Sequence, residues 1–192
     1  SLKAELAVVA DEKAFEELRT LLAGSGTEVA CGRAAVIAAA GLPADWTMAA
    51  ITGAAGLEPT LAAVKNGKSI ALANKEALVC AGDVMLRAVA DAGATLLPVD
   101  SEHNAIAQAM ADKQADQVAK IILTASGGPF RKASLEEMEA ATPAQALKHP
   151  PWSIGAKITL HSATMLNKRL EEIAAAPIFG LTDSPLHLLV HP

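Results

Sequence analysis

The sequence predicts an α/β chain in two parts, a doubly wound parallel sheet followed by an α+β part that carries the candidate site. Short apolar runs alternate with helical stretches through the first half, an order typical of parallel sheets covered by helices. Of the 192 residues, 52% are hydrophobic and 19% are charged, which is enough apolar material for a buried core. After Gly93, polar and acidic residues directly follow the apolar runs, so we place the boundary there.

The first part, residues 1–93, is predicted to repeat a strand followed by a helix four times. The predicted strands cover residues 6–10, 28–31, 46–52 and 69–73. The predicted helices cover residues 12–23, 33–40, 58–66 and 76–92. Because each parallel strand must be reached by a crossover connection, this order predicts a parallel sheet with helices on both faces.

The second part, residues 94–192, is predicted to mix strands and helices less regularly. Strands are expected at residues 95–99, 120–124 and 157–160, and helices from near residue 104 and over 165–175. Ser134 and Glu137 have the spacing of a capping box, which predicts a helix beginning after Ser134. The chain starts at Ser1 and stops at Pro192 directly after an apolar run. We therefore expect both ends to continue in a longer protein and this part to be incomplete at its C-terminus.

Composition argues against several classes of function. The net charge is −5, and the chain has no Tyr and three Phe, so nucleic-acid binding is not expected. No apolar run reaches the roughly 18 residues that span a bilayer, so no membrane association is expected. Cys31 and Cys80 lie far apart without a metal-binding spacing, which indicates free thiols in a reducing, intracellular compartment.

Asp100 and Glu102 follow a predicted strand and form a candidate site for a divalent cation. Two acids two residues apart at the end of a strand can project to the same side, and carboxylate oxygens suit Mg²⁺ or Mn²⁺. The alternative is a solvated loop that caps the helix expected near residue 104. Glu171, on a later predicted helix, could supply a third carboxylate.

Two further stretches have the residues of a phosphate site. The run 126–128 (SGG) follows a strand, where glycines allow backbone N–H groups to approach an anion. Ser162, at a predicted strand-to-helix turn, with Asn167 and Lys168 in the first helical turns, adds hydroxyl, amide and ammonium donors. Each has an ordinary alternative, because SGG also suits a tight turn and Ser162 a helix cap.

Three loops could contact a larger ligand. The runs 53–56 (GAAG) and 73–76 (ANKE) both lie at strand-to-helix junctions, where doubly wound sheets bind ligands, although neither is a GxGxxG. The run 149–152 (HPPW) is either an ordinary loop around a tryptophan or a lid over a site.

Read in order, a set of motifs resembles the 1-deoxy-D-xylulose 5-phosphate reductoisomerase family. The motifs are ALANKEALV, LLPVDSEHNAI, ILTASGGPF, HPPWSIGAKI, SATMLNKRLEE and LLVHP. The resemblance runs from about Leu6 to Pro192 and implies a Rossmann-like first part and a catalytic second part. It also implies conversion of 1-deoxy-D-xylulose 5-phosphate to 2-C-methyl-D-erythritol 4-phosphate in non-mevalonate isoprenoid synthesis, with NADPH and Mg²⁺, Mn²⁺ or Co²⁺. A homodimer in the bacterial cytoplasm, or in the plastid stroma of a plastid-bearing source, is expected on the same ground.

The resemblance also assigns roles to individual residues. The metal ligands would be Asp100, Glu102 and Glu171, and these count with Lys75 and His149 as catalytic. The substrate contacts would be Ser101, Ser126, Trp152, Ser162, Asn167 and Lys168, with His149 and Trp152 in the lid. The NADPH contacts would be Ala54, Gly56, Asn74, Lys75 and Glu76.

The chain departs from the family pattern in one arm of this site. The family has Asp, Gly and an acid where this chain has His161, Arg169 and Ala174, and we expect Arg169 to crowd the metal and phosphate positions. The family's GxTGxIG cofactor loop is not in the chain. Two alternatives therefore stand beside a reductoisomerase: a truncated, catalytically impaired paralogue that keeps the fold and dimerises or binds phosphate, and a metal-dependent sugar-phosphate isomerase that does not use NADPH.

Overall fold

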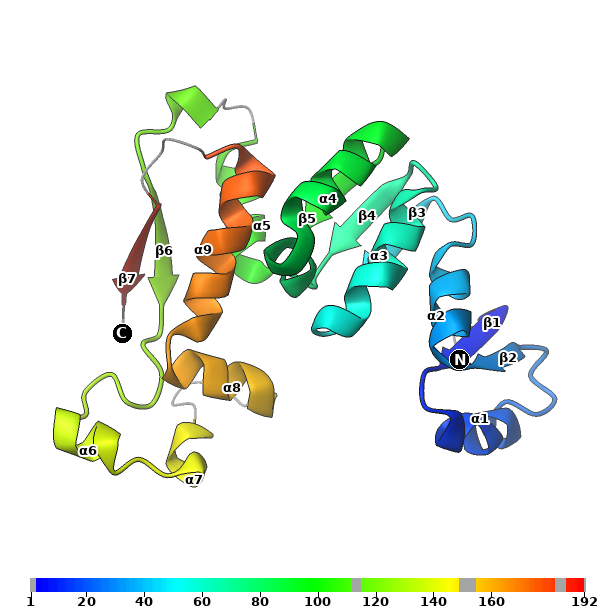
Figure 1. Cartoon of the computed structure of the whole chain (residues 1–192), viewed down its shortest axis with the longest axis horizontal. Helices are drawn as coiled ribbons and strands as arrows, with labels where there is room; N and C mark the ends of the chain where they lie inside the picture. The colour runs from blue at the N-terminus through cyan, green and yellow to red at the C-terminus, as the bar shows by residue number, and fades with distance from the viewer. Residues whose placement is uncertain (1–2, 112–114, 149–154, 182–185, 192) are drawn as a thin grey trace. The chain divides into compact units, whose positions relative to one another are not determined.

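The structure is a computed structural model that describes residues 3–111, 115–148, 155–181 and 186–191. The chain divides into two compact units, Ser1–Val99 and Asp100–Pro192 (Figure 1). The boundary predicted near Gly93 comes before strand β5 (Thr95–Pro98), which pairs with β4 (Ser69–Leu72) and so belongs to the first unit. No helix among the described residues is long and apolar enough to cross a membrane.

The first unit contains parallel strands, as the sequence predicts. Strands β1 (Leu6–Val9) and β2 (Glu28–Cys31) form one parallel pair. Strand β3 (Trp46–Ala49) pairs with β4, and β4 with β5, in a three-stranded parallel sheet of order β3-β4-β5. The helices between them are η1 (Glu12–Ala14), α1 (Phe15–Leu21), α2 (Arg33–Ala40), η2 (Ala54–Gly56), α3 (Leu57–Val64) and α4 (Glu76–Ala92).

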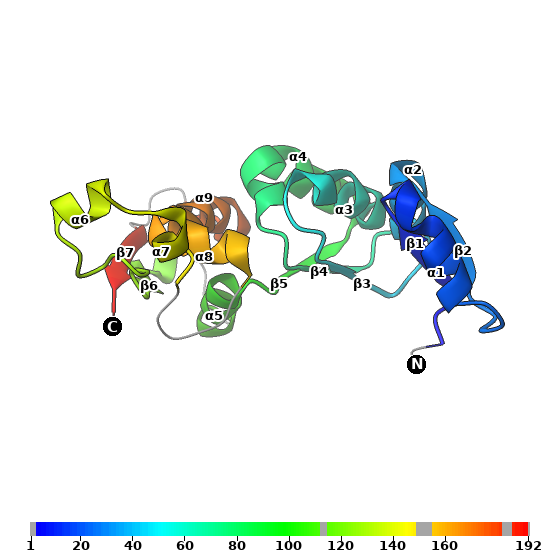
Figure 2. The same ribbon diagram turned by 90° about the horizontal axis from the view of Figure 1, so that it is seen from below.

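Helices α3 and α4 cover one face of the β3-β4-β5 sheet, as Figure 2 shows. On β4, Ile70 and Leu72 alternate with Ala71 and are 1% and 3% exposed. Met85 of α4 is also fully buried. In the row of the sheet that contains Ala71, that residue is buried, whereas Met48 and Leu97 on the neighbouring strands are each more than 40% exposed.

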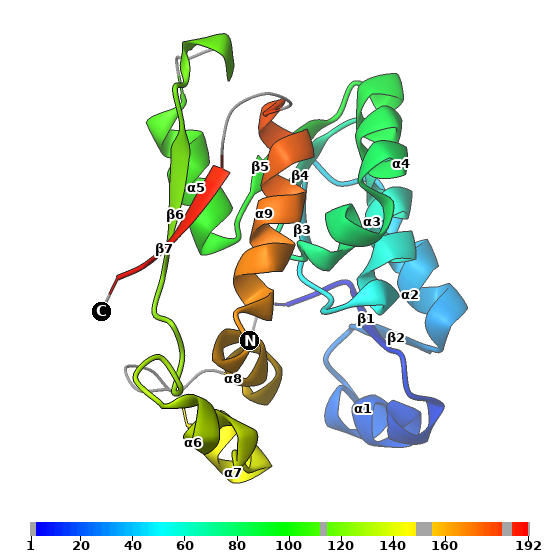
Figure 3. The same ribbon diagram turned by 60° about the vertical axis from the view of Figure 1, so that its left-hand side comes forward.

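The second unit packs helices around a parallel pair of strands. Strand β6 (Ile121–Ala125) pairs with β7 (Leu186–Val190). Helix α9 (Leu166–Phe179) runs alongside this pair (Figure 3). Ile106 of α5 (Ser101–Ala109), Leu123 of β6 and Ala175 of α9 form the buried core. The remaining helices are η3 (Ala115–Gln117), α6 (Leu135–Glu139), α7 (Pro143–Ala146) and α8 (Ala156–Ala163).

Helix α8 replaces the strand predicted over residues 157–160, and this prediction was wrong. Gly155 has an extended backbone and caps the helix, and the Thr159 N–H and hydroxyl both donate to the Gly155 carbonyl, at 3.0 and 3.1 Å. A short run with Ile158 and Thr159 carries too little β preference to override this helical pairing. As a result, Ser162 lies in the last turn of a helix and not at a strand-to-helix turn.

The capping box predicted at Ser134 is confirmed. The Glu137 N–H donates to the Ser134 hydroxyl at 3.2 Å, and the Ser134 N–H donates to the Glu137 carboxylate at 2.7 Å. These two bonds satisfy donors that the first turn of α6 would otherwise leave open. Strand β7 was not predicted, although its apolar run pairs residue by residue with β6.

Candidate metal and substrate site

Three carboxylates meet where helices α5 and α9 pack against each other. Asp100 is the N-cap of α5, Glu102 lies in its first turn, and Glu171 lies in the middle of α9. One carboxylate oxygen from each lies within 4.8 Å of the others, and Glu171 is fully buried. Within the described α5, the Asp100 side chain makes no capping hydrogen bond, which argues against the loop-cap alternative. The arrangement suits a hard divalent cation that prefers oxygen ligands.

Lys168 supplies a positive charge inside this acidic cluster. Its ammonium donates to Glu102 Oε1 and, at 2.8 Å, to Glu171 Oε2, and the residue is only 8% exposed. Asn167 adds a hydrogen bond from its amide to the other oxygen of Glu171. Buried carboxylates require such partners, because an uncompensated charge in the interior is strongly destabilising. In the structure, Asn167 and Lys168 therefore form hydrogen bonds within the carboxylate cluster.

Glu102 is held in its ionised form. Burial acts to raise the pKa of this carboxyl, but hydrogen bonds from Lys168 and Ser101, together with the Lys168 charge, outweigh it and lower the pKa below 4.5. The Ser101 hydroxyl donates to Glu102 Oε2 at 2.6 Å. Ser101 thus orients a carboxylate, and Glu102 presents the deprotonated oxygens that a metal ligand needs.

His103 is a buried member of the site that the sequence analysis did not single out. Its Nε2 lies 2.8 Å from the Glu171 backbone carbonyl, and its Nδ1 lies 3.7 Å from Asp100 Oδ1. The residue is 1% exposed. The one signal in the sequence is its position three residues after Asp100, which puts both on the same face of α5.

The glycine loop after β6 packs directly on the C-terminal end of α8. Gly127 and Gly128 have φ values of 76° and 67°, where L side chains are strained. A Cβ on Gly128 would lie 2.5 Å from the Ser162 carbonyl oxygen and 2.9 Å from Ala163 Cα. This close approach brings the predicted phosphate residues Ser126 and Ser162 onto neighbouring segments of one unit.

The predicted cofactor residues gather at one junction of the first unit. The Asn74 amide nitrogen donates to the Gly53 carbonyl at 3.1 Å, and a Cβ on Gly56 would lie 2.2 Å from that same nitrogen. Asn74 is 2% exposed, and its buried Oδ1 accepts no hydrogen bond from any described residue. This oxygen can accept a bond from a ligand, so Ala54, Gly56 and Asn74 fit a cofactor site. Lys75 and Glu76 continue from Asn74 as the N-cap and first residue of α4.

Arg169 does not point at the carboxylates. Its guanidinium pairs with Glu172 at 2.6 Å, and its side chain is 65% exposed. The crowding expected from this residue is therefore not seen in the described part of the chain. Ala174, where the family has an acid, is fully buried in α9.

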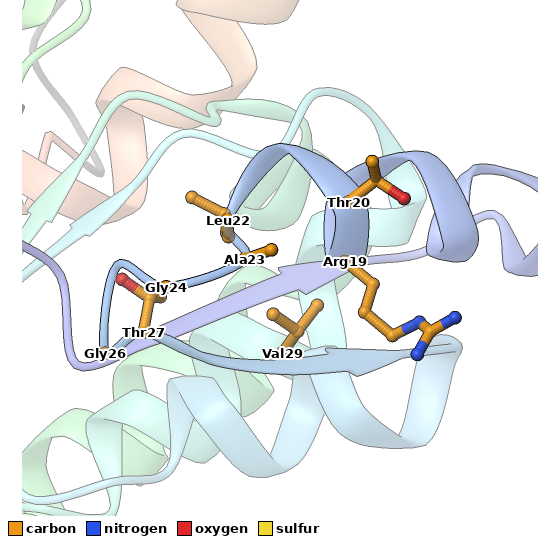
Figure 4. A pocket seen from close by; sticks show the side chains of 8 residues that line it. All are labelled: Arg19, Thr20, Leu22, Ala23, Gly24, Gly26, Thr27 and Val29. Atoms are coloured by element: carbon orange, nitrogen blue, oxygen red, sulfur yellow. The ribbon is translucent and has the colours of Figure 1, made fainter.

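His149 and Trp152 are outside the described residues. Figure 4 shows a hollow in the first unit between the end of α1, the following loop and β2. None of the predicted site residues lines it, and Arg19, its charged lining residue, is paired with Glu16 at 2.5 Å.

Similarity to known proteins shows the family of this chain. A family model described as 1-deoxy-D-xylulose 5-phosphate reductoisomerase matches residues 1–82, and the model of that family's C-terminal domain matches residues 96–179. The chain belongs to the 1-deoxy-D-xylulose 5-phosphate reductoisomerase family. A reductoisomerase of Gluconobacter oxydans is 69% identical over 191 residues, which is 100% of this chain and 47% of the relative. The enzyme of Nitrobacter hamburgensis is 56% identical over 98% of this chain and 46% of its own length.

Solved reductoisomerases have the same fold as this chain. The enzyme of Zymomonas mobilis in complex with NADPH is 52% identical, with a TM-score of 0.89 over 98% of this chain and 48% of that one. A reductoisomerase in complex with NADPH, fosmidomycin and magnesium is 40% identical, with a TM-score of 0.89 over 99% and 50% of the two chains. The chain thus spans about half the length of the relatives it matches. The α/β fold predicted from the sequence is confirmed.

Proposed function

We propose that this chain carries metal-, substrate- and cofactor-binding residues of an NADPH- and divalent-metal-dependent reductoisomerase. The reaction is conversion of 1-deoxy-D-xylulose 5-phosphate to 2-C-methyl-D-erythritol 4-phosphate, in non-mevalonate isoprenoid synthesis. The observation that carries the proposal is the cluster of Asp100, Glu102 and Glu171 within 4.8 Å, in a chain of this family. Related structures in complex with NADPH and magnesium support the choice of cofactors.

The carboxylates of Asp100, Glu102 and Glu171 would hold Mg²⁺, Mn²⁺ or Co²⁺. When bound, such a cation polarises the carbonyl and hydroxyl oxygens of the substrate as a Lewis acid. Lys168 pairs with both Glu102 and Glu171 and offsets part of their negative charge. Ser101 keeps Glu102 oriented through its 2.6 Å hydrogen bond. These residues prepare the oxygen ligands before the substrate arrives.

The phosphate of the substrate would bind to polar groups of the second unit. We assign Ser126, Ser162, Asn167 and Lys168 to it, supported by the close approach of the glycine loop to the end of α8. Such contacts far from the reacting carbons hold the substrate in place and contribute binding energy to the reaction. His149 and Trp152 are assigned to a lid that excludes water.

The nicotinamide cofactor would bind at the junction that contains Ala54, Gly56 and Asn74, with Lys75 and Glu76 beside it. When bound, NADPH supplies the hydride that reduces the aldehyde formed by rearrangement of the carbon skeleton. Asn74 offers a buried oxygen acceptor, and the absence of a side chain at Gly56 leaves room for that amide. Lys75 is assigned a second role at the substrate.

Oxidation of NADPH by the purified chain with 1-deoxy-D-xylulose 5-phosphate and Mn²⁺ tests this proposal. We expect turnover that Asp100→Asn abolishes, because the variant replaces a charged oxygen ligand with a neutral amide. Conversion of the sugar phosphate without NADPH oxidation would instead indicate the isomerase alternative. Absence of turnover in a folded wild-type chain would contradict the proposal and favour the impaired paralogue.

Assembly and location follow from the family resemblance. We propose a homodimer that works in the cytoplasm of a bacterial cell. Light scattering of the chain as it elutes from a sizing column gives its mass directly. Elution at the 19.6 kDa of one chain, at all concentrations tried, would contradict the dimer for this chain.

A further inference from the structure

We propose that His103 is a positioning residue that fixes Asp100 and Glu171 relative to each other for metal binding. Its two ring nitrogens face the two elements that carry the ligands: Nδ1 faces the Asp100 carboxylate at the start of α5, and Nε2 faces the backbone of Glu171 on α9. The inference rests on the proposed metal site and adds a residue that does not itself touch the metal or the substrate.

The bond to α9 determines the orientation of the imidazole. A backbone carbonyl oxygen can only accept a hydrogen bond, so Nε2 carries the proton and donates it to Glu171 O across 2.8 Å. This bond fixes the ring plane and directs Nδ1 to Asp100 Oδ1, 3.7 Å away. That second distance is too long for a direct hydrogen bond, so the ring lies beside the Asp100 carboxylate without bonding to it.

Burial and packing hold the ring in this orientation. His103 is 1% exposed and meets Phe179 edge to face, with ring centroids 6.5 Å apart and an interplanar angle of 63°. Phe179, at the end of α9, packs against the core that contains Ile106 of α5. His103 therefore contacts α9 at two points, just over two turns apart along that helix.

The arrangement links the geometry of the ligands to one side chain. Helix α5 carries Asp100 and Glu102, and α9 carries Glu171, so the distance between the carboxylates depends on how these helices are aligned. Removal of a residue that orients a metal ligand without touching the metal typically lowers metal affinity by about 10- to 100-fold. Because His103 contacts the backbone of Glu171, its replacement leaves all three carboxylates chemically intact.

Mn²⁺ titration followed by electron paramagnetic resonance tests the role of His103. His103→Phe keeps an aromatic ring against Phe179 but removes both nitrogens, and we expect its Mn²⁺ affinity to fall by about 10- to 100-fold. His103→Gln places an amide N–H near the position of Nε2, so it should recover most of that loss. His187→Gln, on β7, is the control for loss of a histidine outside the site.

Circular dichroism shows whether each variant is folded at the titration temperature. Should His103→Phe not fold, His103→Asn replaces it, because the shorter amide does not reach the Glu171 carbonyl. The positioning role would be overturned if His103→Phe or His103→Asn bound Mn²⁺ with wild-type affinity. It would also be overturned if His103→Gln lost as much Mn²⁺ affinity as His103→Phe. Either result would leave the proposed metal site intact. Failure of the wild-type chain to bind Mn²⁺ would overturn both proposals.

Discussion

Lys168 places its ammonium between Glu102 and Glu171, in the cluster where the sequence suggested a divalent cation. The same lysine is assigned to the substrate phosphate, so one side chain contacts two of the proposed metal ligands and would also contact the substrate. Replacing Lys168 should therefore affect both the stability of the carboxylate cluster and the binding of the sugar phosphate.

The first prediction at this scale concerns the stability contributed by Lys168. Lys168→Met should lower the free energy of unfolding of the metal-free chain by about 3–5 kcal/mol, because it leaves a buried carboxylate uncompensated. Added Mn²⁺ should raise the free energy of unfolding of this variant more than that of the wild type. Urea unfolding of each protein with and without Mn²⁺ measures these free energies. Arg169→Met removes an exposed ion pair on the same helix and should cost about 0–1 kcal/mol. Equal losses of unfolding free energy in Lys168→Met and Arg169→Met would refute the role of Lys168 in stabilising the buried carboxylates.

The second prediction concerns pH. The pKa of Glu102 is lowered in the folded chain, so its contribution to stability is present above the ordinary value of 4.5 and is lost as the pH falls through the folded value. The difference in unfolding free energy between the wild type and Glu102→Gln should therefore shrink as the pH is lowered from neutral through this range. Ser101→Ala removes one of the donors that lower the pKa, so it should reduce the same pH-dependent difference. A difference that does not change with pH would contradict this account.

At the scale of elements, the junction of β6 and α8 depends on Gly128, a position where a side chain does not fit. Gly128 has positive φ, and the backbone of Ser162 and Ala163 occupies the place of a side chain. The SGG run was predicted as a candidate anion loop, but residues 157–160 were predicted as a strand, so this contact could not be predicted. Contacts between segments far apart in the chain are not encoded in local residue preference.

Comparison of two glycines separates this contact from backbone strain. Gly180 ends α9 with φ 64°, close to the 67° of Gly128, but among the described residues no atom beyond its chain neighbours and its own helix lies within 4 Å of the position of its Cβ. Gly180→Ala should cost about 1–2 kcal/mol through strain alone. Gly128→Ala should cost a further 1–3 kcal/mol or so, because backbone must move. Equal unfolding free energies of the two variants would show that the loop is not held against α8.

At the scale of the whole molecule, the sequence predicts most of the strands but not all of the site. The five strands of the first unit are short apolar runs between turns, and all five were predicted to within a few residues. Asp100 and Glu102 were recognisable as a pair because they are close in the chain. Their meeting with Glu171 was implied by the family resemblance, since no local pattern joins α5 to α9. The role of His103 was missed for the same reason, because it depends on the packing of those two helices.

The two units divide the proposed functions. The three carboxylates all belong to Asp100–Pro192, and the cofactor residues Asn74 and Gly56 belong to Ser1–Val99. Each unit has its own buried residues. Metal binding can be measured without NADPH, so it tests the carboxylate cluster alone.

Titration with Mn²⁺ of the wild type, Glu171→Gln and Glu172→Gln tests the central claim most directly. Glu171 and Glu172 are neighbours on α9, but Glu171 lies in the carboxylate cluster, whereas Glu172 pairs with Arg169. The account predicts that the wild type and Glu172→Gln bind Mn²⁺ with similar affinity and that Glu171→Gln loses at least about tenfold. Equal affinity in all three folded proteins would contradict a metal site at Asp100, Glu102 and Glu171.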